Sequence, residues 1–151
     1  MTISVVRYHS GMASPPALPS LTDPGALVNL LKAVLVDGFN TLSATSVTRS
    51  GSTVTLQTAS NHPYAVNEVV EVMGADQSAY NGWKRVLSVP AANQITFEVG
   101  SAPASPATGT ITIRHPPAGW TATAAGTNNY CFRTRTAGSQ GHYIQIEDNN
   151  P

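Results

Sequence analysis

The sequence predicts a mainly β fold with one helix, in which the middle of the chain forms a small antiparallel β-barrel or β-sandwich. Between residues 45 and 114, six short runs rich in β-branched and aromatic residues alternate with turn residues at nearly regular spacing. Helical periodicity is clear only in residues 22–38. Charged residues make up only 11% of the chain, and small polar residues, glycine and proline take their place, as is typical of strands and turns.

The helix is expected at residues 24–36, because its leucines and valines recur at the spacing of one apolar helix face. The residues with this i, i+3, i+4, i+7, i+8 spacing are Leu27, Leu30, Leu31, Val34 and Leu35. Thr22 or Asp23 can cap the free amides at the helix start, and Pro24 suits its first turn. Gly38 can adopt the left-handed conformation that often ends a helix.

Little polar surface remains on the other sides of this helix, where Val28, Ala33 and Val36 lie. A helix this apolar is expected to be covered on more than one side, partly by its own chain and partly by a neighbouring subunit. We place Val28 on the flank that meets the neighbour. The candidate subunit-packing residues are Leu27, Val28, Leu31, Val34 and Leu35.

The strands of the middle segment begin with a hairpin, in which residues 46–49 and 53–57 alternate around a Ser-Gly-Ser turn. The further strands of this segment are expected at residues 68–72, 83–89, 95–99 and 110–114. After a Pro-rich linker at residues 115–119, residues 130–135 and 142–148 predict a second hairpin. The prolines of residues 15–19 favour an extended N-terminal arm.

The charge balance argues against a nucleic-acid partner and against attraction to a membrane surface, because eight basic residues offset eight acidic ones without a run of either. The first residues lack the pattern of a secretory signal, so we expect synthesis in a cytoplasm. Cys131 is the single cysteine, which excludes an internal disulfide and a multi-cysteine zinc site. We expect it in a buried strand, with a thiol that links subunits as the alternative.

No motif in the sequence points to catalysis, to a metal or to a cofactor. A Gly-x-Ser-x-Gly elbow, a P-loop and a Rossmann fingerprint are absent. Glu68 and Glu71 lie on opposite faces of an expected strand, and Glu147-Asp148 is expected to be a solvated end. The histidines are too widely spaced to predict a metal site; they are His9, His62, His115 and His142.

The two tryptophans, Trp83 and Trp120, are weak candidates for ligand binding, because an exposed indole ring can stack on a sugar. Exposure of either ring beside Asn or Asp would favour this role. Each tryptophan is flanked by residues typical of a core, so packing within the chain is the expected role.

One stretch of the middle segment follows a recognisable pattern. Residues 61–75 read NHPYAVNEVVEVMGA, and the pattern continues with YNG at 80–82, VLSV at 86–89 and NQITF at 93–97. This resembles a small β module of tailed-phage and prophage virion proteins, whose motif runs H-G-hydrophobic-x-x-G-D-x-V-x-V-x-G, then Y-N-G, then N-x-h-T-F. Pro63 and Asn67-Glu68 stand where that module usually has Gly and Gly-Asp.

The flanking segments follow a second pattern. The helix PGALVNLLKAVLVDGF at residues 24–39 is followed by Gly-Trp-Thr at 119–121, by the strand at 130–135 and by YIQIED at 143–148. This order resembles a small family of phage structural proteins. The resemblance implies a discontinuous outer α+β module, made of residues 1–44 and 115–151, into which the β-barrel or β-sandwich of residues 45–114 is inserted.

We therefore expect a non-catalytic structural protein of a bacteriophage virion, without a cofactor, whose partners in a homo-oligomer are copies of itself and other virion proteins. Its low charge suits protein interfaces, whose centres exclude charged residues. The expected place is the tail, the baseplate or the head–tail neck, with capsid decoration as the nearest alternative. An adhesin module that binds carbohydrate or a host receptor is a second alternative. A cell-wall hydrolase would require a cleft with acids or a metal.

Overall fold

The computed structural model describes residue 16, residues 23–135 and residues 143–149. The described chain divides into two compact units. Residues 40–116 form the curled-sheet unit, and residues 23–39 together with those from 117 onward form the helix–sheet unit. Most of the expected Pro-rich arm, His142 and the turn expected before it lie outside the described residues.

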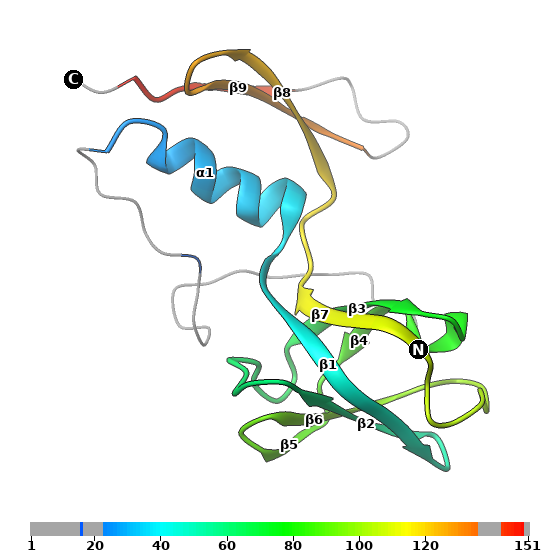
Figure 1. The fold of residues 1–151 in the computed structure, drawn as a ribbon. Coiled ribbons are helices and arrows are strands. Elements are labelled where there is room, and N and C mark those ends of the chain that lie inside the picture. Colours follow the sequence, from blue (N-terminus) through cyan, green and yellow to red (C-terminus); the bar gives the residue numbers. More distant parts are fainter. Residues whose placement is uncertain (1–15, 17–22, 136–142, 150–151) are drawn as a thin grey trace. The chain divides into compact units, whose positions relative to one another are not determined.

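The expected mainly β fold with one helix is confirmed (Figure 1). The curled-sheet unit is built on one antiparallel sheet that curls into a half-barrel, in the order β4-β3-β7-β1-β2-β6-β5. Its strands are β1 (Phe39–Ser50), β2 (Thr53–Thr58), β3 (Val69–Ala75), β4 (Gly82–Arg85), β5 (Ser88–Ala91), β6 (Gln94–Glu98) and β7 (Gly109–His115). Since β1 begins at residue 39 and β7 ends at residue 115, the unit is longer at both ends than the expected 45–114.

The core of the curled sheet follows from strand alternation. The hairpin of β1 and β2 forms as expected, with Ser50 opposite Thr53. Along β2, Val54 lies opposite Phe97 and Leu56 lies opposite Ile95, and all four of these side chains are buried. Such directly opposite apolar pairs stabilise a sheet on its buried face. Strands β3 and β7 contribute Val70, Val72, Ile111 and Ile113 to the same core.

The strand expected at residues 83–89 is divided in two, and that expectation is wrong in this detail. Between β4 and β5 the chain crosses from one side of the curled sheet to the other. The N–H of Val86 donates to the carbonyl of Glu68 at 2.9 Å, and the N–H of Leu87 donates to the carbonyl of Thr96 at 2.8 Å. The two amides therefore bond to opposite sides of the curled sheet, and the Val86 side chain is buried in its core.

A close approach of backbone near the edge of this unit requires glycine. Gly74 has a φ of 81°, and a Cβ at this position would overlap the carbonyl of Thr110. Gly109 faces the same place from β7, where the register between β3 and β7 shifts. Beside it, the side chain of Asn81 accepts from the N–H of Ala75 and donates to its carbonyl, at 3.0 and 2.7 Å. An amide side chain thus replaces a strand partner at the end of β3.

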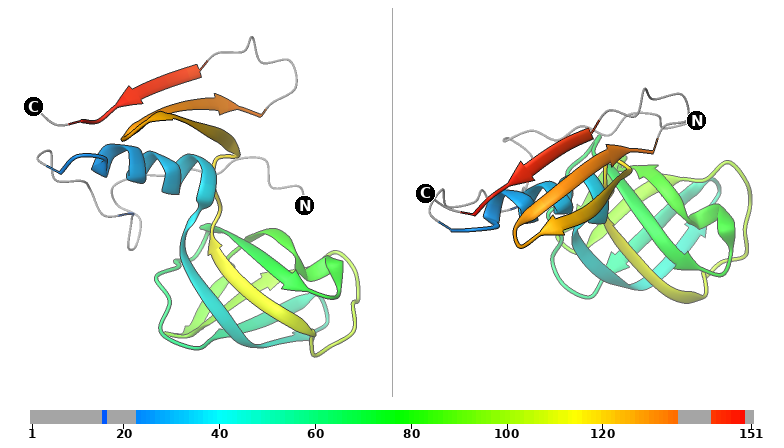
Figure 2. Two further views of the ribbon diagram at one scale, coloured as in Figure 1. Left: turned by 45° about the horizontal axis from the view of Figure 1, so that its top comes forward. Right: turned by 90° about the horizontal axis from the view of Figure 1, so that it is seen from above.

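The helix–sheet unit consists of a short helix over one face of a three-stranded antiparallel sheet (Figure 2). Helix α1 (Ala26–Lys32) continues into a π-helical turn at Ala33–Asp37. The sheet order is β10-β9-β8, with β8 (Trp120–Gly126), β9 (Asn129–Thr134) and β10 (Tyr143–Glu147). The hairpin expected from the last two strands is confirmed, since Ile144 lies opposite Phe132 and Ile146 opposite Tyr130. No helix among the described residues has the length and apolar character needed to cross a membrane.

The helix start is held by the far end of the chain and not by the expected cap. Gly25 occupies the N-cap position without a side-chain hydrogen bond. The carboxylate of Asp148 accepts from the N–H of Leu27 at 2.8 Å, and its carbonyl accepts from the N–H of Gly25 at 2.9 Å. An acid suits this place because free amides and the helix dipole favour negative charge there. Asp148 is therefore not the solvated end that was expected.

Residues 40–116, expressed alone, should unfold in one cooperative transition and give a β-type circular dichroism spectrum. The matched fragment of residues 45–114 lacks the first part of β1 and the end of β7. Its midpoint temperature should be lower by at least about 4–8 °C, the shift that about 1 kcal/mol causes in a domain of this size. Equal midpoints for the two fragments in differential scanning calorimetry would contradict unit boundaries at residues 40 and 116.

Candidate functional site

The candidate subunit-packing helix is oriented differently from the expectation. Leu27 is 41% exposed, whereas Val28 is only 2% exposed and is the buried residue of α1. The expectation that Val28 lies on an exposed flank is therefore wrong. The remaining candidates, Leu31, Val34 and Leu35, are half-buried.

Leu27 and Val28 lie in the regular α-helical part, and there Val28 is the side chain that is covered. The π-helical turn follows at Ala33 and affects only the residues after it. A π-helical turn adds residues to the turn, so that side chains beyond it are displaced around the helix axis. The regular spacing counted from Leu27 to Leu35 assumes a constant 3.6 residues per turn, but the helix changes type at Ala33. The apolar residues therefore do not form one face that is either wholly covered or wholly open.

The two tryptophans belong to different units. Trp83 lies in β4 opposite Glu71, in the curled-sheet unit, and Trp120 opens β8 opposite Thr134, in the helix–sheet unit. Both rings are half-buried. This partial burial agrees better with packing than with a fully exposed stacking platform for a sugar.

The three-stranded sheet has two distinct faces, which follow from its register. Directly opposite residues of neighbouring strands share a face. One face lies toward α1, because Lys32 of the helix is 5.1 Å from the ring centroid of Tyr130, and buried Phe132 stacks beside that ring. The same face carries Trp120, Ala122, Ala124, Ile144 and Ile146. The opposite face carries Thr121, Thr123, Cys131, Arg133, Tyr143 and Gln145.

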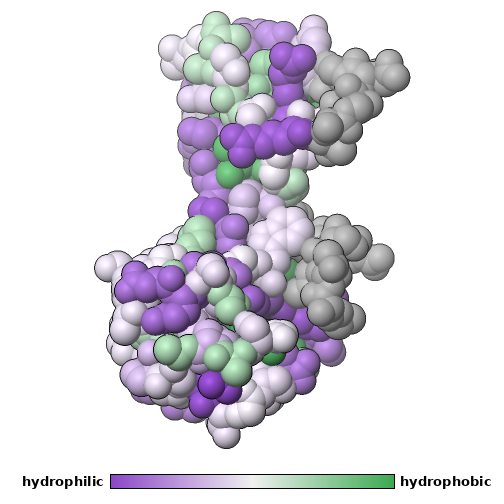
Figure 3. Space-filling view, turned by 90° about the vertical axis from the view of Figure 1, so that its right-hand side faces the viewer, coloured by the Kyte–Doolittle hydropathy of each residue, from purple (hydrophilic) through white to green (hydrophobic). Residues whose placement is uncertain are grey.

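The outer strand β10 leaves large apolar side chains exposed. Tyr143 is 61% exposed and Ile144 is 47% exposed, although Ile144 lies on the face toward the helix. The apolar layer beneath α1 therefore continues to the open edge of the sheet. Cys131 of β9 is half-buried. On the molecular face drawn in Figure 3, apolar residues reach the surface in both units and are interspersed with polar ones.

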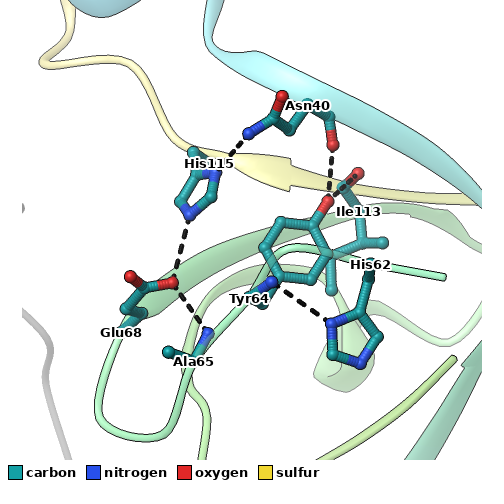
Figure 4. A network of polar contacts seen from close by, with 7 residues as sticks. All are labelled: Asn40, His62, Tyr64, Ala65, Glu68, Ile113 and His115. Carbon is teal, nitrogen blue, oxygen red and sulfur yellow. Dashed lines mark hydrogen bonds and ion pairs between the residues drawn. The ribbon is translucent and has the colours of Figure 1, made fainter. Parts of the chain in front are cut away.

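The curled-sheet unit contains a buried polar network that the sequence did not indicate (Figure 4). The hydroxyl of Tyr64 shares its single proton between two carbonyls, that of Asn40 in β1 at 2.6 Å and that of Ile113 in β7 at 3.0 Å. Beside this ring, at 5.0 Å between centroids, lies His115. The hydroxyl therefore links β1 and β7, the strands by which the chain enters and leaves the unit.

His115 is 1% exposed and lies at the end of β7, not in the linker where it was expected. Its Nε2 lies 3.2 Å from the Glu68 carboxylate, and its Nδ1 lies 3.4 Å from the Asn40 side-chain amide. A neutral ring that donates from Nε2 and accepts at Nδ1 satisfies both partners. Burial lowers the pKa of His115, and the hydrogen bond and charge of Glu68 oppose that shift only in part.

The remaining members of the network fix the loop before β3. The Glu68 carboxylate also accepts from the N–H of Ala65 at 2.9 Å, and Nδ1 of His62 accepts from the N–H of Tyr64 at 3.2 Å. Burial raises the pKa of Tyr64, so its hydroxyl remains a donor. These contacts give the network a structural role, that of holding the loop against β1 and β7. Among the described residues, no group of three His, Cys, Asp or Glu side chains could hold a metal ion.

Comparison with known proteins identifies no relative. No family model matches the chain, and neither the curated proteins nor the solved structures contain a match.

Replacement of Tyr64 by Phe should destabilise the protein by about 1–3 kcal/mol, because two backbone carbonyls lose their buried donor. Thr45→Val is the matched control, since it removes an exposed hydroxyl that donates to the carbonyl of Gln57, and it should change stability by less than about 0.5 kcal/mol. Urea unfolding of both variants measures the difference. Equal stabilities would mean that the Tyr64 hydroxyl does not link the two strands.

Stability should fall as the pH drops below 6.5, the ordinary pKa of histidine. The lowered pKa of His115 means that the unfolded chain takes up a proton before the folded chain does, so acid favours unfolding. His115→Gln keeps an amide donor and acceptor but cannot titrate. Its unfolding free energy should therefore depend less steeply on pH between 7 and 5 than that of the unchanged protein. Parallel slopes in urea titrations across this range would contradict the assignment.

Proposed function

We propose that this chain is a non-catalytic structural protein of a bacteriophage particle, where it acts in assembly at the tail, the baseplate or the head–tail neck. The observation that carries this proposal is the exposure of large apolar side chains on both units. In the curled-sheet unit these are Val66, Leu87 and Val89, and in the helix–sheet unit they are Leu27, Tyr143 and Ile144. Exposed apolar side chains on two separate units are available for burial against more than one neighbour.

The composition of the chain supports the same proposal. Only 11% of its residues are charged, and the charges balance, so the protein has little to keep its copies apart in solution. Protein interfaces likewise have few charged residues at their centres. The phage-like sequence patterns of residues 61–97, 24–39 and 119–148 favour a virion as the setting.

The buried polar network supports the non-catalytic part of the proposal. Tyr64, Glu68 and His115 are the kinds of residue that catalysis uses, but each of them bonds to a backbone or side-chain group of the same unit. His115 is almost wholly buried, so that a substrate could not reach its ring without local unfolding.

Particles purified on a density gradient, from a bacterium that carries this gene within a phage or prophage, should contain the chain in a fixed molar ratio to the other virion proteins. Quantitative mass spectrometry of the gradient fractions measures this ratio, and deletion of the gene should reduce the yield of complete particles. Recovery of the chain in the soluble fraction alone, with normal particles after deletion, would contradict the proposal.

A matched pair of substitutions separates assembly from folding. Leu27→Lys places a charge on an exposed position beside Asp148 and should leave the melting temperature almost unchanged while it lowers incorporation into particles. Val28→Lys buries a charge and should unfold the helix–sheet unit. Normal incorporation of the Leu27→Lys variant would exclude α1 from the assembly contacts.

A further inference from the structure

Strand β10 is an open edge of the three-stranded sheet. Among the described strands, only β9 pairs with it, and its other side has no strand partner. An open strand edge presents a row of backbone donors and acceptors to which another strand can bond. The edge therefore offers a place for a strand of another molecule.

The other sheet edges carry features that oppose such pairing. Strand β4 ends in Lys84 and Arg85, and β5 contains Pro90 and has an irregular register. Charges, proline and irregular register on an edge are the usual means by which proteins prevent strand addition. Strand β8 exposes only small residues, from Thr123 to Gly126, and its register shifts before that glycine. In contrast, β10 has no proline and no lysine, and it exposes Tyr143 and Ile144.

We propose that β10 is the contact between two copies of this chain, paired antiparallel about a twofold axis at Gln145. A twofold axis perpendicular to the sheet reverses the strand direction and keeps the two faces, so paired residues must share a face. Centring at Gln145 meets this condition and uses all five residues of β10. Ile144 then lies opposite Ile146 of the second copy, on the face that carries α1 in each. This pairing covers the exposed side chain of Ile144, at the edge of the apolar layer beneath α1.

The charges of β10 are compatible with this pairing. Its one charged residue, Glu147, lies opposite Tyr143 of the second copy, whose hydroxyl can donate to the carboxylate. The two Glu147 carboxylates are then about 14 Å apart along the strand direction, from four steps of about 3.4 Å, which exceeds the screening length of about 8 Å. Gln145 lies opposite itself, and an amide can both donate and accept. No like charges face each other.

This inference deepens the proposed function by naming a contact between copies, and it rests on that proposal only for the setting in a particle. The test uses the full chain and sedimentation equilibrium. Gln145→Lys changes an exposed residue and places two like charges opposite each other on the axis, which should raise the dissociation constant of the dimer by about tenfold or more. Thr123→Lys is the matched control, because Thr123 is exposed and belongs to the same row of the same sheet face, on the opposite edge.

A mixture of two oppositely charged variants gives the decisive test of this pairing. Gln145→Glu should also weaken the dimer of identical chains, whereas an equimolar mixture of the Gln145→Lys and Gln145→Glu chains should pair again, because opposite charges then meet on the axis. Thr123→Lys should dimerise normally. A monomeric unchanged protein, a dimer insensitive to Gln145→Lys, or long polymers that Thr123→Lys prevents would each overturn the inference. A dimer with these properties, in a chain that never enters particles, would instead contradict the proposed function alone.

Discussion

The hydroxyl of Tyr64 is the contact on which the curled-sheet unit depends, because one hydrogen-bond donor links the two strands through which the chain enters and leaves it. It reaches the carbonyls of Asn40 in β1 and Ile113 in β7, and these strands are neighbours in the sheet. The pairing of β1 with β7 and this side-chain contact together hold both ends of the unit at one place, around which residues 40–116 enclose their own core. His115 and Glu68 complete this junction from the end of β7 and from the loop before β3.

The two units differ in how far their edge strands are protected from pairing with another strand. In the curled-sheet unit the chain crosses at Val86, where the N–H groups of Val86 and Leu87 bond to opposite sides of the curled sheet. The strands that remain at its edges are short or charged. The helix–sheet unit has one short helix for three strands, and a helix covers only a limited width of sheet. The outermost strand therefore keeps apolar residues at its surface, as Ile144 shows. Contacts with other molecules are the natural use of such an edge.

Much of the fold could be predicted because apolar residues repeat every two positions in a strand and every 3.6 positions in a helix. Both patterns lie within a short stretch of sequence. The β1–β2 hairpin, the β9–β10 hairpin and a single helix near residue 30 all follow from such patterns. The expectation failed for one strand and for the orientation of the helix. Residues 83–89 read as one strand because the pattern does not mark the crossing at Val86. The buried side of α1 was misjudged because the spacing of its apolar residues does not show which of them the rest of the unit covers.

The β-rich class, the places of most strands and the scarcity of charge all follow from the amino-acid sequence, since each depends on residue type and spacing alone. Which polar residues contact one another depends on the three-dimensional fold. Asn40, the loop residues Tyr64 and Glu68, and His115 come from three separate parts of the chain, and Asp148 reaches the helix start across 121 positions. Such partners are set by how the sheets curl and pair. A short-range pattern contains no information about that geometry, because the distance between two residues along the chain does not fix their distance in space.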